Sequence, residues 1–97
     1  MKNLPQATAT VQVDNQRVRV TEWRFAPGAE TGEHVHEFDY VVVPGGTGRL
    51  KLVSPEGRES FADLQQGVSY FRNAGVHHNV VNANDFEYAF VEIELKR

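Results

Sequence analysis

The chain of 97 residues contains no cysteine, which excludes disulfide bonds and thiolate metal ligands. It also lacks any apolar run near the roughly 20 residues of a membrane-spanning helix, and its N-terminus has no apolar stretch typical of a signal peptide. Its 10 lysine and arginine residues are scattered along the chain, with only Lys96 and Arg97 adjacent, so the sequence shows no basic cluster of the kind that binds nucleic acid. We therefore expect a cytoplasmic protein that binds neither nucleic acid nor membranes.

No stretch of the chain has a sustained helical periodicity, and the segments that remain read as short strands. They recur every 8 to 12 residues or so with turn signals between them, which predicts an all-β sandwich or barrel. A chain of this length forms one domain, which we place at residues 1–97 with an N-terminal arm at residues 1–7. The strands are expected over residues 8–13, 17–25, 38–43, 50–53, 58–62, 68–71, 78–81 and 86–95.

Two of these strands carry patterns that predict how they are covered. In the strand over residues 17–25 the apolar face changes near Thr21 and Glu22, which indicates a bulge or a strand covered on both sides. The last strand is expected to bury one face. The residues assigned to that buried face are Ala89, Val91, Ile93 and Leu95.

All four histidines lie in two segments of the chain, as His34 and His36 in one and His77 and His78 in the other. Side chains alternate along a strand, so His34 and His36 point to the same side. One strand thereby presents two imidazole nitrogens to one metal ion, and imidazole is the commonest metal ligand in proteins. A third imidazole has to come from His77 or His78, whose side chains face opposite ways.

The same alternation places the residues that follow this histidine pair. Tyr40 shares the parity of the histidines and is expected inside the barrel if they are. It would then be a phenolate ligand, a neutral phenol that donates a hydrogen bond or a proton, or a core aromatic. Glu37 and Asp39 have the opposite parity and are expected to point outward.

The spacing within the two histidine segments resembles the two conserved motifs of the cupin family. Asn73 stands where that family usually has proline, and Tyr40 stands where it usually has a glutamate metal ligand. The resemblance covers roughly residues 18–95. The stretch from Thr21 to Pro44 is also similar to small one-domain cupins of β-alanine degradation. The matching positions are Gly28, His34 and His36 in the first segment, and Gly67, Gly75, His78 and Asn82 in the second.

The resemblance implies a conical jelly-roll β-barrel in which the histidines hold a divalent transition metal. The spacing after Gly75 selects His78 as the third ligand beside His34 and His36, and leaves His77 outside or at the mouth. Three neutral imidazoles accept Fe, Zn, Ni, Cu or Mn, and they leave coordination positions for water, Tyr40 or a substrate.

Two functions fit such a site. The first is a metal-dependent enzyme acting on a small organic molecule, either a dioxygenase or a Lewis-acid isomerase or lyase, with Tyr40 as the candidate catalytic residue. The second is a non-catalytic small-molecule-binding module. A homodimer is expected, through the N-terminal arm or the outer sheet. Candidates to line a pocket are Trp23, Phe25, Phe38, Phe71 and Phe90, and candidates to bind a carboxylate at its rim are Arg24, Arg49 and Arg72.

Overall fold

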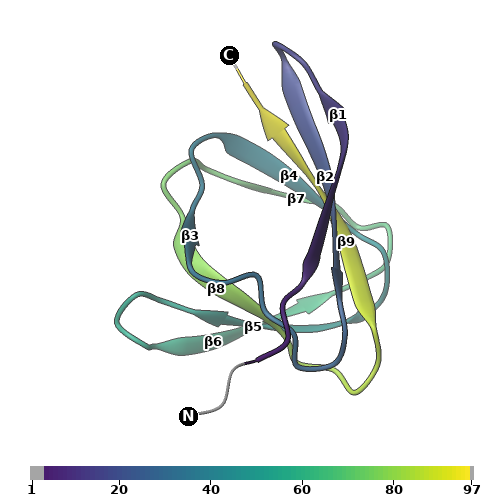
Figure 1. The fold of residues 1–97 in the computed structure, drawn as a ribbon, viewed down its shortest axis with the longest axis vertical. Coiled ribbons are helices and arrows are strands. Elements are labelled where there is room, and N and C mark those ends of the chain that lie inside the picture. Colours follow the sequence, from purple (N-terminus) through teal and green to yellow (C-terminus); the bar gives the residue numbers. More distant parts are fainter. Residues whose placement is uncertain (1–3, 97) are drawn as a thin grey trace.

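The computed structural model describes residues 4–96, and every regular element in this range is a β-strand. The strands form two antiparallel sheets that lie on opposite sides of one interior (Figure 1). No helix in the described part of the chain is long and apolar enough to cross a membrane. The all-β prediction is confirmed, and residues 1–3 of the predicted arm lie outside the described range.

The sheet topology carries the chain back and forth between the two layers, so neighbours in a sheet come from distant parts of the sequence. One sheet has five strands and the other has four. The first contains, in spatial order, β1 (Thr8–Asp14), β2 (Val18–Phe25), β9 (Tyr88–Leu95), β4 (Asp39–Pro44) and β7 (Tyr70–Arg72). The second contains β3 (His34–Val35), β8 (His77–Asn82), β5 (Gly48–Val53) and β6 (Glu59–Leu64).

The interior between the sheets is apolar over part of its length. Phe25 and Phe90, on neighbouring strands, pack with ring centroids 5.5 Å apart, and both are almost completely buried. Burying large aromatic and aliphatic side chains of this kind is the main term that stabilises a small domain. The other core residues are Ala29, Tyr40, Val42, Leu50, Leu64, Val80 and Tyr88.

The bulge predicted near Thr21 lies in the partner strand instead. β2 pairs with β9 in an unbroken register from Val18 to Phe25. The register shifts in β1, between Val11 and Val13, directly across from Thr21 and Val20. The change of apolar face along β2 therefore reflects its two environments, with Phe25 in the core and Val20 on the outer face.

The prediction for the last strand is wrong, because β9 turns its other face inward. Its buried side chains are Tyr88, Phe90, Glu92 and Glu94. The residues predicted to be buried are half-buried or exposed on the outer face. Alternation alone cannot choose between two faces that both carry apolar residues, and the interior accepts two glutamates here because each has a hydrogen-bond donor.

The outer face of the five-stranded sheet carries a row of apolar side chains that crosses all its strands. Register pairing aligns one residue from each strand in this row. Phe71, at one end, is 53% exposed, and Val13, at the other, is 43% exposed. The outer row consists of Val13, Val20, Ile93, Val41 and Phe71.

Candidate metal centre

Pairing of β3 with β8 brings the two histidine segments together. The antiparallel register puts His34 directly opposite His78. His36 lies just beyond β3, where its backbone N–H donates to the Val76 carbonyl at 2.9 Å and its carbonyl accepts from Gly75 N–H at 2.8 Å. Gly75 has φ = +98°, a conformation that glycine adopts without steric cost. This turn therefore holds the chain leading into His78 against His36.

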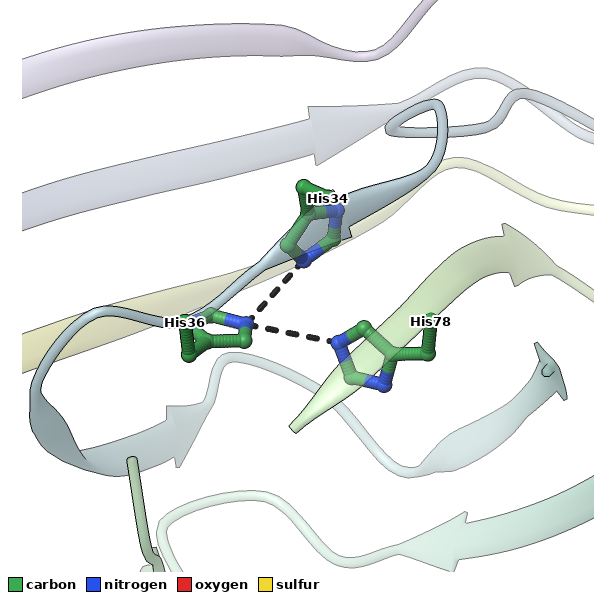
Figure 2. A group of neighbouring side chains, drawn as sticks. All are labelled: His34, His36 and His78. Atoms are coloured by element: carbon green, nitrogen blue, oxygen red, sulfur yellow. Dashed lines mark hydrogen bonds between the residues drawn. The ribbon is translucent and has the colours of Figure 1, made fainter. Parts of the chain in front are cut away.

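The three side chains meet at their Nε2 atoms. The Nε2 atom of His36 is 3.0 Å from that of His34 and 3.3 Å from that of His78 (Figure 2). Among the described residues this is the one group of three or more histidines, aspartates or glutamates whose ligand atoms all lie within 4.8 Å of one another. The predicted convergence of His34, His36 and His78 is therefore observed.

These separations fit three ligands of a single ion. Imidazole nitrogens bind a metal ion such as zinc at about 2.0–2.1 Å, so two ligands on the same side of it are roughly 3.0–3.4 Å apart. The observed spacings of 3.0 and 3.3 Å lie in that range. The cluster could hold a metal ion, and three neutral nitrogens leave its identity open.

Hydrogen bonding sets the orientation of the His34 imidazole. The Nδ1 atom of His34 lies 2.9 Å from the carbonyl oxygen of Gly32, which can only accept a hydrogen bond. The proton of neutral His34 is therefore on Nδ1, and Nε2 keeps its lone pair toward the other two rings. Such a hydrogen bond to the non-ligating nitrogen is typical of histidines that bind metals.

Burial keeps the other two imidazoles neutral at physiological pH. Desolvation, reinforced by the nearby His34, lowers the pKa of His36 to about 4. Desolvation and both neighbouring histidines lower the pKa of His78 to about 3. Metal binding requires unprotonated imidazole. Both residues are thus in the ligating form over a wide pH range before any ion arrives.

Tyr40 lies in the interior, as its parity predicted, and its ring stacks on that of His36. The ring centroids are 3.9 Å apart, the interplanar angle is 17°, and Tyr40 is 2% exposed. Burial, with a smaller contribution from Glu92, raises the pKa of the Tyr40 phenol above its ordinary value of 10.0. Because this favours the neutral phenol over the phenolate in the metal-free protein, we expect Tyr40 to orient His36 rather than to bind an ion.

Replacement of Tyr40 by phenylalanine tests this assignment. Because the aromatic ring and its stack on His36 remain, Tyr40→Phe is expected to change the affinity for a divalent ion less than about threefold, below 1 kcal/mol. Isothermal titration with Co²⁺ measures it. A much larger loss in Tyr40→Phe would show that the oxygen of Tyr40 is itself a ligand.

Glu92 is a site residue that the sequence reasoning missed. It lies on β9 with 7% exposure, and its Oε2 atom is 3.9 Å from Nε2 of His36. Trp23 donates its indole N–H to the other carboxylate oxygen at 3.3 Å. Burial, with repulsion from Glu94, raises the pKa of Glu92 to about 7. The available signal in the sequence was that Glu92 has the same strand parity as Phe90, a candidate for the pocket lining, although the other face of this strand was expected to be buried.

A small cavity of about 210 Å³ adjoins the histidines. Arg19 lines it and donates two hydrogen bonds to Glu94, at 2.8 and 2.9 Å. This size suits a molecule of a few heavy atoms. A larger cavity of about 490 Å³ between β6 and β7 has no histidine in its lining, and we therefore assign the site to the smaller one. Its lining residues are Arg19, Trp23, Thr31, His34, Val35, His36, Glu37 and Glu94.

The other predicted residues near the motif lie outside the cluster. His77 is exposed, as predicted, and its Nε2 atom is 2.6 Å from Oε2 of Glu33. Glu37 and Asp39 are exposed as well. Asp39 accepts a hydrogen bond from the Ala74 backbone at 2.7 Å, so it supports the turn before β8.

The predicted arginines differ in their partners. Arg24 pairs with Glu22 at 3.1 Å, and Arg49 pairs with Asp63 at 2.9 Å. Arg72 lines the larger cavity, with its guanidinium 5.7 Å from the ring of Tyr70. None of the three lines the smaller cavity beside the histidines.

The predicted aromatic lining is correct only in part. Trp23 lines the smaller cavity, while Phe25 and Phe90 belong to the core. Phe38 is half-buried. Phe71 is on the outer face, so its assignment to the pocket is wrong. The apolar runs of edge strands do not reveal which side of the sheet is covered.

Comparison with solved structures identifies the class of protein that this fold and site define. A cupin domain from Bordetella pertussis has a TM-score of 0.95 and 57% identity, with 100% of both chains covered. A cupin superfamily protein from Desulfitobacterium hafniense has a TM-score of 0.72 and 15% identity, and the match covers 100% of this chain and 84% of that protein. At this identity the match shows the fold alone. No family model matches the chain. The chain nevertheless belongs to the cupin family, as its full-length similarity to the Bordetella domain shows.

A curated relative extends the comparison to a protein with a named role. The "Beta-alanine degradation protein BauB" of Pseudomonas aeruginosa is 60% identical over 96 residues, which is 99% of this chain and 100% of that protein. The predicted similarity to small one-domain cupins of β-alanine degradation is confirmed.

Proposed function

We propose that this cupin is a metal-dependent enzyme acting on a small organic molecule. The observation that carries the proposal is the convergence of three Nε2 atoms, at 3.0 and 3.3 Å, beside a cavity of about 210 Å³. When bound, the ion would supply Lewis-acid polarisation or, as Fe(II), activation of O₂. The name of the Pseudomonas relative supports a role in β-alanine degradation.

The chain's own residues divide the work around this site. His34, His36 and His78 would hold the ion, and the ring of Tyr40 keeps the His36 imidazole in place. On the cavity side, Trp23 offers an apolar surface and Arg19 a guanidinium already oriented by Glu94. A small molecule bound there lies against one face of the histidine cluster, which is the arrangement that positions a reacting group.

Metal analysis of the purified protein tests whether the histidine cluster binds a transition-metal ion, which both proposed chemistries require. We expect one transition-metal ion per chain, loss of the ion on chelation, and rebinding of Fe(II), Zn²⁺ or Co²⁺ afterwards. A protein that contains no such ion and rebinds none would refute the proposal. If metal binds but small carboxylic acids, aldehydes and thiols of a few carbons are bound without turnover, the non-catalytic binding module is the better description.

We also propose that a second copy of the chain covers the outer face of the five-stranded sheet. Five strands about 4.8 Å apart and six residues at about 3.3 Å each make a face of roughly 480 Å². Two such faces bury about 1,000 Å², the lower limit for a specific interface. The outer row supplies the apolar centre that such an interface needs.

Phe71→Glu is expected to abolish this dimer, because it places a charge within the outer row where the residue is 53% exposed. Phe61→Glu is the matched control, since Phe61 is 56% exposed on β6 of the other sheet. Light scattering at micromolar concentration should give twice 10.9 kDa for the wild type and the control. A wild-type mass near 10.9 kDa would rule out the dimer.

A further inference from the structure

Glu92 is a buried carboxylate that points at the histidine cluster from the opposite sheet. Its side chain is 9% exposed, and Oε2 is 3.9 Å from Nε2 of His36. The indole of Trp23 donates a hydrogen bond to the other oxygen, Oε1, at 3.3 Å, so one neutral donor holds the carboxylate. The orientation of Glu92 is therefore determined by a residue that lines the cavity.

The neighbouring Glu94 has a cationic partner, and Glu92 has none among the described residues. Glu94 receives two hydrogen bonds from the guanidinium of Arg19, at 2.8 and 2.9 Å, and its charge is balanced. Within residues 4–96, Glu92 has no lysine or arginine within ion-pair distance, and its contact at that range is with the imidazole of His36, at 3.9 Å. A buried carboxylate is costly unless a cation is close to it.

Glu92 does not belong to the ligand set itself. The three histidines form the group whose ligand atoms all lie within 4.8 Å, and no atom of Glu92 completes that group. Its distance of 3.9 Å from Nε2 of His36 is longer than the 3.0 and 3.3 Å that separate this nitrogen from those of His34 and His78. The effect of Glu92 on an ion held by the histidines would thus be electrostatic, at a distance where charges in a buried site still interact strongly.

We propose that Glu92 is the charge-balancing carboxylate of the metal centre, supplied by β9 to an ion that the three histidines hold. This inference rests on the proposed metal site. Three imidazoles bring no negative charge, and among the side chains whose contacts with the histidines are described, Glu92 has the buried carboxylate nearest to a ligand nitrogen. The negative charge of Glu92 would raise the affinity of the centre for a cation and lower its affinity for an anion.

Removing the charge of Glu92 should lower the affinity for a cation and raise the affinity for an anion. Damage to the structure of the site would instead lower both affinities. Glu92→Gln keeps the shape and removes the charge, so the affinity for Co²⁺ should fall by about 10- to 100-fold, the usual effect of removing an outer partner of a metal site. The affinity of the Co²⁺-loaded protein for azide should rise at least about threefold, because a repelling charge is gone. Visible absorption of Co²⁺ follows both titrations.

Two further variants complete the experiment. Glu92→Asp, which keeps the charge, should retain more of the Co²⁺ affinity than Glu92→Gln does. Glu56→Gln is the matched control for net charge, because Glu56 is exposed in the turn between β5 and β6, and it should behave as the wild type. Unchanged Co²⁺ affinity in Glu92→Gln, or a parallel loss of Co²⁺ and azide binding, would overturn the inference. A wild type that binds no Co²⁺ would refute the proposed function instead.

Discussion

Replacing His36 by alanine is expected to lower the affinity for a divalent ion by more than about 100-fold, beyond the loss caused by removing an outer partner. His36 is the residue common to both short contacts of the cluster, at 3.0 Å from His34 and 3.3 Å from His78. Without it, the remaining two imidazoles come from different strands and no longer surround one position. Isothermal titration with Zn²⁺ or Co²⁺, after removal of bound metal, measures the effect.

His77 provides the matched control for this substitution. It is adjacent to a cluster member in the sequence, yet its side chain is 40% exposed and pairs with Glu33. His77→Ala removes the same imidazole and should keep the wild-type affinity. Circular dichroism of both variants checks the fold, since His36→Ala also removes the ring on which Tyr40 stacks. Loss of binding in His77→Ala, or its retention in a folded His36→Ala, would contradict the assignment of the site.

The second large effect is a pH-dependent gain in stability of Glu92→Gln over the wild type, in metal-free protein. Because burial raises the pKa of Glu92 from 4.5 to about 7, the folded state binds a proton that the unfolded state releases between these values. The stability that Glu92 contributes is present below pH 4.5 and is lost as the pH rises through about 7. At about 1.4 kcal/mol per pH unit, the loss is roughly 3 kcal/mol.

Glutamine at position 92 does not titrate, so the difference in free energy of unfolding between variant and wild type should grow by about 3 kcal/mol from pH 4.5 to pH 8. His36 and His78 act in the opposite direction, since their lowered pKa values give stability that is lost as the pH falls below 6.5. The wild type and Glu92→Gln both contain these histidines, so the contribution of the histidines to the pH dependence cancels in the comparison. Urea unfolding at each pH, with a chelator present, measures the difference in free energy of unfolding between Glu92→Gln and the wild type. If this difference does not depend on pH, Glu92 is not buried as described.

The histidine site illustrates what can be predicted from residue order. Alternation predicted Tyr40 inside and Glu37 and Asp39 outside, and the structure has them so, although the chain leaves β3 at Val35 and enters β4, in the other sheet, at Asp39. The choice of His78 over His77 came from the resemblance to cupin motifs. The register places His78, and not His77, opposite His34 across β3 and β8, and His78 is in the histidine cluster.

The faces of β9 illustrate what could not be predicted. Ala89, Val91, Ile93 and Leu95 make a more apolar set than the alternate residues, and burial of that set was the natural expectation. The structure buries the other set, because the interior contains the indole of Trp23 and the guanidinium of Arg19 as donors for the glutamates. Those donors lie about 70 residues away in sequence and come close only through the β2–β9 pairing.

The sequence by itself determined most of the strands and turns and the two histidine segments, because each depends on residues a few positions apart, but it did not reveal the short strand β3. The tertiary structure alone decided which face of each strand is enclosed, and so brought Glu92 to the histidines and left the outer row uncovered. Burial is a property of the assembled sheets. For a strand with apolar residues on both faces, the neighbouring strands in space therefore decide which face is buried and which is exposed.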